Sequence, residues 1–375
     1  MAQKIRLGEF IEEFSVRNKT GDKIPVYSVT NREGFCKDYF NKDVSSVDKT
    51  TYKIVPYGYF AYNPSRINVG SVDWQRSEEQ VIVSPLYVVF SANDYIDKQY
   101  LYYYLKSDIT VAFIKNMASG SVRDNLKLST LKEFLIPKIS IEEQKRCVKI
   151  LDKINMLILK RKEEVEKLDL LVKSRFIEMF GDIIINEKKW IRRPLGELCC
   201  ITRGGSPRPI NQFLGGRIPW IKIGDATIGD NIYLTSTKEH IISDGVKKSH
   251  LVKSGSLIFA NCGVSLGFAR IITFEGCIHD GWLSFEDIDE CLDKVFLLLT
   301  LNFMTKYFRG IAPAGTQPNL NTSIMKQHMQ IIPPLKIQRQ YVSFVQEVDK
   351  SKLAIQQSLE KLETLKKSLM QEYFG

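Results

Sequence analysis

The sequence lacks the features of membrane-inserted and disulfide-bonded proteins. Its 375 residues contain no run of about 18 apolar residues, so we expect no membrane-spanning helix. The opening MAQKIRLGEF has no apolar core of the kind found in signal peptides, and a cytoplasmic location is the default expectation. The seven cysteines are odd in number and include no CxxC pair. We therefore expect free thiols in a reducing compartment, without zinc or disulfides.

Signatures of nucleotide-dependent and metal-dependent enzymes are also missing. The sequence has no GxxxxGK(S/T) phosphate loop, no GxGxxG between a strand and a helix, and no HExxH-like spacing among its four histidines. Asn63-Pro64-Ser65-Arg66 differs from the Asn-Pro-Pro-aromatic loop of adenine methyltransferases, because it lacks the second proline and the ring that hold a flipped base. Glu187-Lys188-Lys189 contains half of a nuclease signature without its Pro-Asp pair, and a solvated charge run explains it. We expect no catalytic residue, no metal ligand and no bound cofactor.

The composition is that of an ordinary globular protein. Hydrophobic residues make up 44% of the chain and charged residues 26%, and low-complexity tracts are absent. A chain of this length can form two domains with separate cores. The formal net charge of +10 is compatible with a polyanionic partner, although many basic proteins bind none.

A two-fold internal duplication organises the chain. The same signals occur in the same order in both halves, which makes chance a poor explanation. The matched pairs are Leu7-Gly8-Glu9 with Leu195-Gly196-Glu197, Gly58 with Gly255, Gly70 with Gly267, Asn125 with Asn319, Ile136-Pro137 with Ile332-Pro333, Gln144 with Gln340, and Phe180-Gly181 with Phe374-Gly375. Each half reads as a mixed, mainly β globular part followed by a long helix.

Apolar residues at steps of three and four predict the two helices, over 141–182 and 337–375. The predicted packing face comprises Leu151, Ile154, Ile158, Val165, Leu168 and Val172 in the first helix, and Val348, Ile355, Leu359, Leu362 and Leu369 in the second. The heptad-like pattern breaks at Arg161 and Lys352. About 40 helical residues would extend ~60 Å, so we expect the helices to pair with each other; packing on their own domains is the alternative. Each segment has a net charge of +1, which leaves most of the positive charge in the globular parts 1–140 and 183–336.

Several local phrases, in their order within the duplication, resemble the specificity subunits of type I restriction–modification systems. No single phrase is diagnostic, and the resemblance covers essentially the whole chain. The phrases are Tyr27-Ser28-Val29-Thr30-Asn31 with Gly34-Phe35, Phe60-Ala61-Tyr62-Asn63-Pro64-Ser65-Arg66-Ile67-Asn68-Val69-Gly70-Ser71, Gly204-Gly205-Ser206-Pro207-Arg208-Pro209, and Met179-Phe180-Gly181-Asp182 followed by Trp190 and Leu195-Gly196-Glu197.

The resemblance implies an α+β fold with two tandem target-recognition domains, 1–140 and 183–336. Each is followed by a spacer helix, and the two helices form an antiparallel coiled coil that sets the distance between the half-sites of a bipartite, asymmetric DNA target. The resemblance also implies docking of two DNA methyltransferase subunits and of restriction/translocase subunits, in a phage-defence complex without a membrane. Those partners, and not this chain, would use S-adenosylmethionine, ATP and Mg²⁺. The alternative is a coiled-coil adaptor that binds no DNA; a self-contained methylating nuclease would need a longer chain.

Polar and basic residues in loops are the candidate DNA contacts. Arg can pair with guanine and Asn with adenine, and flexible basic loops or helix N-termini can approach phosphates. The candidates are Asn63, Arg66, Asn68, Arg123, Lys127, Arg203, Arg208, Gln317, Asn319 and Asn321. A plain turn is the alternative for the Gly204–Arg208 loop, and helix capping is the alternative for the asparagines before the short helices.

Overall fold

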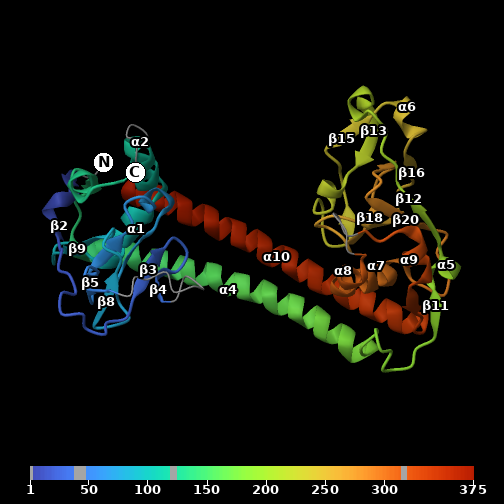
Figure 1. The fold of residues 1–375 in the computed structure, drawn as a ribbon, viewed down its shortest axis with the longest axis horizontal. Helices are drawn as coiled ribbons and strands as arrows, with labels where there is room; N and C mark the ends of the chain where they lie inside the picture. Colours follow the sequence, from blue (N-terminus) through green and yellow to red (C-terminus); the bar gives the residue numbers. More distant parts are fainter. Residues whose placement is uncertain (1–2, 38–47, 119–124, 314–318) are drawn as a thin grey trace. The chain divides into compact units, whose positions relative to one another are not determined.

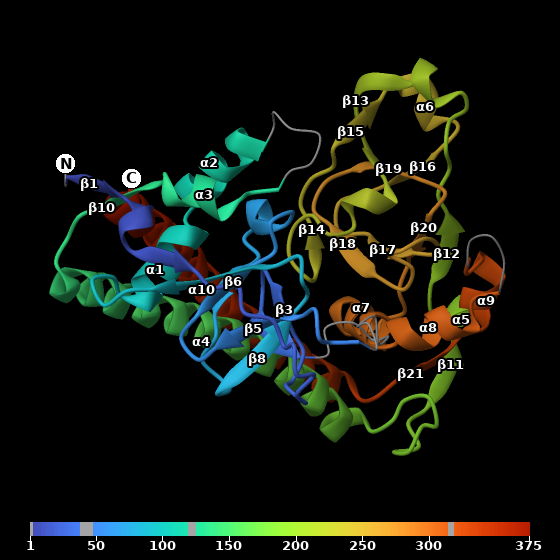
Figure 2. The ribbon, with the colours of Figure 1, turned by 60° about the vertical axis from the view of Figure 1, so that its left-hand side comes forward.

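The structure is a computed structural model that describes residues 3–37, 48–118, 125–313 and 319–375. The chain forms two compact units: unit 1 comprises Met1–Glu164 and Ile355–Gly375, and unit 2 comprises Val165–Ala354. Each unit contains a globular part and parts of both long helices, which Figures 1 and 2 show in green and red. Among the described residues, no helix combines the length and apolarity needed to cross a membrane.

Unit 1 is built on a four-stranded antiparallel sheet in the order β2-β9-β6-β7. Its strands are β2 (Ile11–Glu13), β9 (Val88–Ala92), β6 (Phe60–Tyr62) and β7 (Val72–Trp74). Three strand pairs accompany it: β1 (Lys4–Arg6) with β10 (Leu135–Pro137), β3 (Tyr27–Thr30) with β4 (Gly34–Lys37), and β5 (Lys53–Pro56) with β8 (Gln80–Val83). The short helices are η1 (Leu7–Glu9), η2 (Ile67–Val69), α1 (Lys98–Lys106), α2 (Asp108–Ala118) and α3 (Leu128–Lys132).

Unit 2 contains a five-stranded and a four-stranded sheet. The first has the order β12 (Cys200–Arg203), β20 (Trp282–Glu286), β17 (Leu257–Ala260), β18 (Ala269–Ile272), β14 (Tyr233–Leu234). The second has the order β15 (Glu239–Ile241), β13 (Leu214–Ile221), β19 (Gly276–Ile278), β16 (His250–Val252), and β11 (Arg192–Pro194) pairs with β21 (Met329–Ile331). The short helices are α5 (Leu195–Leu198), η3 (Ile210–Gln212), η4 (Ile223–Asp225), α6 (Ser243–Val246), α7 (Lys294–Phe303), α8 (Thr305–Ile311) and α9 (Thr322–Gln327).

The two long helices are α4 (Ile141–Phe180) and α10 (Leu335–Phe374), against the predicted 141–182 and 337–375. In unit 1 the first part of α4 lies beside the last part of α10, where Lys162 Nζ is 3.6 Å from Glu363 Oε1. In unit 2 the last part of α4 lies beside the first part of α10, where the Tyr341 hydroxyl donates to the Val172 carbonyl at 3.3 Å. The helices therefore pair antiparallel within each unit.

The predicted packing face of these helices is buried or half-buried along its whole length. Leu151, Ile154, Ile158 and Val348 are buried, and the other seven predicted positions are half-buried. The two breaks in the pattern have different explanations. Lys352 is buried, and its ammonium group lies 2.6 Å from Asp169 Oδ1 on the facing helix. Arg161 instead bonds along its own helix to Glu164 at 2.6 Å.

The duplication extends to individual hydrogen bonds. The Leu7 amide donates to the Phe134 carbonyl in unit 1, and the Leu195 amide donates to the His328 carbonyl in unit 2. The glycine pairs predicted to match adopt the same left-handed conformation, which favours glycine: φ is +82° and +85° at Gly58 and Gly255. Gly70 and Gly267 likewise have φ of +85° and +94°.

Two of the pairings predicted from the sequence are wrong. Gln144 Oε1 accepts the Asp97 amide at 2.7 Å, and its counterpart is Gln338, whose Oε1 accepts the Asp293 amide at 2.8 Å, not Gln340. Pro137 ends β10, whereas Pro333 lies beyond β21, so the two Ile-Pro pairs are not equivalent. The predicted pairs were matched by residue type alone. The strand pairing shows instead that Pro137, opposite Lys4, corresponds to Ile331, opposite Arg192.

Candidate nucleic-acid interface

In unit 1, the loop between β6 and β7 carries three of the predicted DNA-contact residues. Asn63 shapes the loop, because its Oδ1 accepts the Ser65 amide at 3.1 Å and the Ser65 hydroxyl at 2.9 Å. Asn68 is half-buried within η2, and Arg66 is exposed just before it. Of the three side chains, Arg66 is therefore the one best placed to reach a nucleic acid.

The described end of a second loop of unit 1, at Leu126, lies against the first loop. The Leu126 amide donates to the Pro64 carbonyl at 3.2 Å, and the buried Tyr62 hydroxyl donates to the Leu126 carbonyl at 3.0 Å. Lys127 follows directly, exposed at the start of α3. The fold thus brings the Arg66 loop and Lys127 together, although they are about 60 residues apart in sequence. Arg123 lies outside the described residues.

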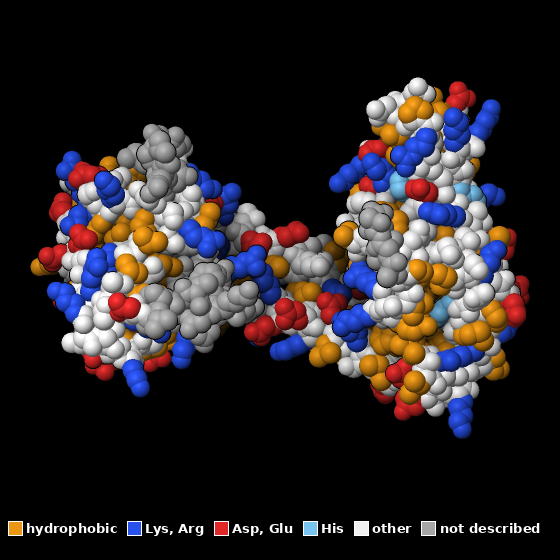
Figure 3. Space-filling model, in the orientation of Figure 1, with side chains coloured by type: hydrophobic (Ala, Val, Ile, Leu, Met, Phe, Trp, Pro, Cys, Tyr) orange, Lys and Arg blue, Asp and Glu red, His pale blue; other side chains and the backbone are white. Residues whose placement is uncertain are grey.

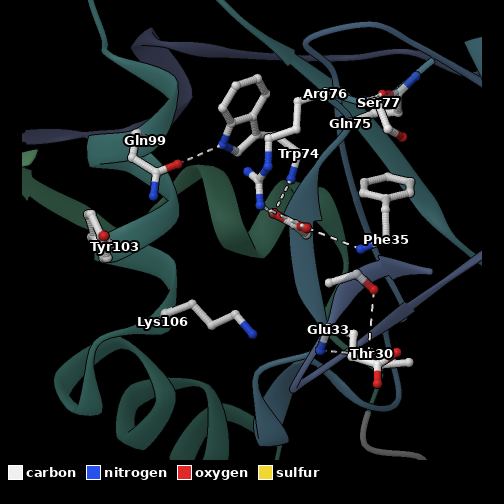
Figure 4. Close-up of polar contacts among 12 residues, drawn as sticks. Thr30, Glu33, Phe35, Trp74, Gln75, Arg76, Ser77, Gln99, Tyr103 and Lys106 are labelled. Carbon is white, nitrogen blue, oxygen red and sulfur yellow. Dashed lines mark hydrogen bonds and ion pairs between the residues drawn. The ribbon is translucent and has the colours of Figure 1, made fainter. Parts of the chain in front are cut away.

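Arg76, which lies beside Trp74 (Figure 4), was not among the contacts predicted from the sequence. Its guanidinium lies 4.8 Å from the Trp74 ring centroid and 5.8 Å from that of Tyr102, within cation–π range. Its nitrogen is 3.3 Å from an oxygen of the buried Asp73 carboxylate. Burial raises the pKa of Asp73, while Arg76 and the Phe35 and Trp74 amides oppose that rise. Arg76 is therefore a cation held in one orientation at the surface.

Lys106 is a second basic residue that was not predicted from the sequence. Its ammonium group donates to the Asn31 carbonyl at 2.8 Å and lies 5.7 Å from the Tyr102 ring centroid. Gly70, at the end of the Arg66 loop, packs on Asn31 so closely that a Cβ atom there would lie 2.7 Å from Asn31 Oδ1. Basic residues interleaved with aromatics in KQYLYYYLK (98–106) were the available signal.

In unit 2, the predicted flexible loop after β12 is packed against its surroundings. The Gly204 amide donates to the Trp282 carbonyl at 2.9 Å, and the Gly205 amide donates to the Ile278 carbonyl at 3.0 Å. A Cβ atom on Gly204 would lie 2.2 Å from the His279 carbonyl oxygen. Only glycine therefore fits here, because the two backbone segments lie too close for a side chain. Because carbonyls of other strands already accept from these two amides, the amides are not free to bind phosphate. Arg208 is exposed in the same loop, and its contact with DNA stays a prediction.

Basic side chains gather around His279 in this unit. Burial lowers the pKa of His279, and the positive charges of Lys222, Arg208 and Arg203 lower it further, against the opposing charge of Asp280. Arg203 is exposed, and its Nε donates to the Asp280 carbonyl at 2.9 Å. Figure 3 shows Lys and Arg side chains beside pale-blue histidines on the upper part of the right-hand unit. The predicted Arg203 and Arg208 are therefore both exposed and both close enough to His279 for their charges to act on it.

The loop between β17 and β18 reproduces the two-loop arrangement of unit 1. The Leu320 amide donates to the Asn261 carbonyl at 2.8 Å, and Asn319 forms a β-bridge with Cys262. Asn319 Oδ1 is buried without a hydrogen-bond partner among the described residues. Asn321 instead accepts the Ile324 amide at 2.9 Å, so the capping alternative holds for its side-chain oxygen. Gln317 lies outside the described residues.

The described residues contain no group of three or more His, Cys, Asp or Glu side chains placed to hold a metal ion. All seven cysteines are free. Burial raises the pKa of Cys199 to about 12 and raises that of Cys262, so burial disfavours the thiolate form at both positions. The exposed Arg66 and Arg203 offer positive charge, which is used for nucleic-acid contact.

Comparisons with known proteins agree with this chemistry. The type I restriction enzyme MjaIX specificity subunit of Methanocaldococcus jannaschii is 28% identical over 275 residues, which cover 68% of this chain and 62% of that protein's length. A chain from a structure described as the basis of complex assembly and conformational transition of the type I R-M system has a TM-score of 0.69 at 18% identity, covering 99% of this chain and 97% of that one. The type I restriction-modification S subunit from M. genitalium has a TM-score of 0.57 at 16% identity, covering 100% and 96%.

At these identities the solved structures show the shared fold, and a family model shows the relationship. The model described as the type I restriction modification DNA specificity domain matches residues 4–167 and again residues 187–366. The two matches correspond to the two halves of the duplication and together span most of the sequence. The chain belongs to the family of type I restriction modification DNA specificity domains.

Proposed function

We propose that this chain is the non-catalytic, DNA-reading specificity subunit of a type I restriction–modification complex. The observation that carries the proposal is the repeated two-loop arrangement. Pro64 and Leu126 join the loops in unit 1, and Asn261 and Leu320 join them in unit 2. Arg66 is exposed within the first pair, and the exposed Arg309 donates to the Val264 and Leu266 carbonyls of the second. Two different readers on one chain suit a bipartite, asymmetric target.

The partners follow from the family. We propose that two methyltransferase subunits and the restriction/translocase subunits assemble on this chain in the cytoplasm. S-adenosylmethionine, ATP and Mg²⁺ would be bound by those subunits, because this chain has no phosphate loop and no methyltransferase loop in its sequence. A related fold in a structure of type I complex assembly supports this part of the proposal.

DNA binding of the assembled complex at several salt concentrations tests the proposal. Replacing Arg66 or Arg208 with Ala should weaken binding to the cognate duplex by about 1–3 kcal/mol if the arginine contacts a base. Arg6→Ala is the matched control in unit 1, because Arg6 is exposed and pairs with Glu133 on the β1–β10 edge. We expect the control to bind like the wild type.

The adaptor alternative makes the opposite prediction. An assembled complex that binds cognate and scrambled duplexes equally at every salt concentration would contradict a DNA-reading role. Equal affinity of both arginine variants and the wild type would remove Arg66 and Arg208 from the interface while leaving DNA binding intact.

A further inference from the structure

Arg76 in unit 1 is an exposed arginine whose guanidinium is held from two sides (Figure 4). Its Nη2 lies 3.3 Å from Asp73 Oδ1, and the guanidinium lies over the Trp74 ring, 4.8 Å from the centroid. Trp74 is itself fixed, because its indole nitrogen donates to Gln99 Oε1 at 3.1 Å. Among the described residues, Arg76 has no hydrogen-bond acceptor other than Asp73, so its other N–H groups remain free to donate to a ligand.

Asp73 holds this arginine in one orientation. It is 2% exposed, and its two oxygens accept the Trp74 amide at 2.8 Å and the Phe35 amide at 3.1 Å. The turn before Phe35 packs on the carboxylate so tightly that no room is left for a Cβ atom on Gly34. Burying a carboxylate is costly, and a mobile arginine would suffice where only positive charge is needed. The buried Asp73 therefore indicates that the direction of the Arg76 donors matters.

Arg76 adjoins the loop that carries Arg66. Arg76 and Lys106 lie 5.8 and 5.7 Å from the ring centroid of the same residue, Tyr102. The Lys106 stem packs on Gly70, where a Cβ atom would lie 3.6 Å from Lys106 Cδ. The residues on either side of Gly70 both donate their amides to the Arg66 carbonyl at 3.2 Å. Direct contacts thus join three cations on one part of unit 1, which suits a polyanionic ligand.

The corresponding positions of unit 2 carry different residues. The β6–β7 and β17–β18 hairpins pair in the same register, in which Arg270 takes the place of Asp73. Thr273 takes the place of Arg76, and its hydroxyl donates to the Leu234 carbonyl at 3.2 Å. Both units would meet the same sugar–phosphate backbone, whereas the two half-sites differ in sequence. An oriented arginine present in one unit alone is therefore suited to a base and not to a phosphate.

We propose that Arg76 donates to O6 and N7 of a guanine in the half-site that unit 1 reads, and that Asp73 is its positioning residue. The inference rests on the DNA-reading function proposed above. A planar guanidinium presents parallel N–H donors, and guanine is the base with two adjacent acceptors on its major-groove edge. Asp73 and Trp74 fix the plane of the guanidinium before DNA binds, which lowers the cost of ordering it on contact.

The test uses the complex assembled with its methyltransferase subunits and duplexes in which single guanines are replaced by 7-deazaguanine, which lacks the N7 acceptor. One replacement in one half-site should weaken wild-type binding about tenfold, because a hydrogen bond to a charged donor is lost. Arg76→Ala should bind the cognate duplex more weakly and be insensitive to that replacement, with wild-type sensitivity at every other guanine. Arg6→Ala is the control, because the exposed Arg6 pairs with Glu133 and should respond to each replacement as the wild type does.

Asp73→Asn tests the positioning role, because it retains Arg76 and removes the charge that holds it. We expect this variant to lose sensitivity at the same guanine and to keep it at the other positions of that half-site. Unchanged sensitivity at that guanine, or a loss of discrimination across the whole half-site, would overturn the positioning role. Arg76→Ala decides the guanine contact independently, since Arg76 is exposed and its removal leaves the buried core intact.

The guanine contact is overturned if no replacement weakens the wild type, or if Arg76→Ala responds to every replacement as the wild type does. It is also overturned if Arg76→Ala weakens binding to cognate and scrambled duplexes by the same factor and lowers the salt dependence, which is the behaviour of a phosphate contact. A wild-type complex that does not prefer its cognate duplex to a scrambled one would overturn the proposed function itself, which is a distinguishable result.

Discussion

At the scale of single residues, two buried glutamines join the globular parts to the long helices. Gln144 is 3% exposed and Gln338 is fully buried. Gln144 accepts the Asp97 amide and donates to the Tyr95 and Ile139 carbonyls. Gln338 makes the corresponding three bonds in unit 2. The first turn of each long helix is thereby fixed to the loop before α1 or α7.

Replacing Gln338 with Leu should lower the free energy of unfolding by about 1–3 kcal/mol, because the Asp293 amide and two carbonyls lose their buried partner. Urea denaturation followed by circular dichroism measures the change. Gln356→Leu is the control, since Gln356 is exposed on the same helix. Equal urea midpoints for wild type and Gln338→Leu would show that these three hydrogen bonds contribute nothing to stability.

His328 predicts a pH dependence of stability. Burial, with a smaller contribution from Arg192, lowers its pKa to about 4. The unfolded chain, with a histidine pKa of about 6.5, therefore binds more protons than the folded chain between those values. Stability should be fully present above pH 6.5 and fall as the pH drops toward 4. His328→Phe should flatten this fall, measured as the urea midpoint from pH 7.5 to 4.5.

The exposed His240 provides the comparison for that experiment. His240→Asn should follow the wild-type pH profile. If the urea midpoint of His328→Phe falls with pH as that of the wild type does, His328 is not the cause of the fall, whatever the absolute stability of the variant.

The residue scale also shows the limits of sequence prediction. Asn321 was a candidate for base contact, yet its oxygen caps α9, because local hydrogen bonding competes with any external partner. Arg76 and Lys106 were missed since their neighbours Trp74, Tyr102 and Asn31 come together only on folding. The exposure of Arg66 and Arg208 was predictable because a polar side chain in a loop needs no tertiary partner to remain exposed.

At the scale of elements, the long helices were predictable because burial of one face imposes a period that the sequence displays directly. The segment 294–309 also reads as one helix, yet α7 ends at Phe303 and α8 begins at Thr305. Thr305 donates to the Gly267 carbonyl at 3.0 Å, a contact from another part of unit 2. Tertiary contacts of this kind set helix ends, and periodicity does not reveal them.

The Lys352–Asp169 ion pair joins α4 and α10 in unit 2, and its contribution to stability can be tested. Removing one partner of an ion pair leaves the other charge unpaired, which costs most where the remaining charge is buried, as Lys352 is, and least where it is exposed to water, as Asp169 is. Asp169→Asn should therefore destabilise the protein by about 1–2 kcal/mol, moderated by Asp349 at 3.8 Å and by the partial exposure of Asp169. Lys352→Met should be neutral or stabilising in the same denaturation assay.

Glu347→Gln removes an exposed charge from the same helix and should change little. If Lys352→Met destabilises the protein more than Asp169→Asn does, the ion pair contributes net stability and the argument from desolvation fails.

At the scale of the whole molecule, the unit that begins first along the chain is the one whose last residues come at the end of the sequence. Unit 2 is one continuous stretch, Val165–Ala354, whereas unit 1 needs both Met1–Glu164 and Ile355–Gly375. Phe374 is buried in unit 1, with its ring centroid 5.1 Å from Tyr100 and 5.9 Å from Tyr104. Phe180 takes the corresponding place in unit 2, 5.0 Å from Phe296.

Phe374→Ala should thus weaken unit 1, although most of that unit lies more than 200 residues earlier in the sequence. We expect a loss of about 3–5 kcal/mol, as for other buried phenylalanines. Limited proteolysis with mass spectrometry should locate early cleavage within residues 1–164. The neighbouring Tyr373→Ala is the milder comparison, because Tyr373 is half-buried. Early cleavage within 165–354 instead would contradict this assignment of Phe374.

The discontinuity of unit 1 has a consequence for vectorial synthesis. A ribosome that has produced the first 164 residues has made the strands of unit 1 but not the phenylalanine that fills their core. Unit 2 can close as soon as Ala354 emerges. The domain translated first is therefore completed last, and its apolar core positions around Tyr100 stay available to chaperones, proteases or a second nascent chain until translation reaches Phe374.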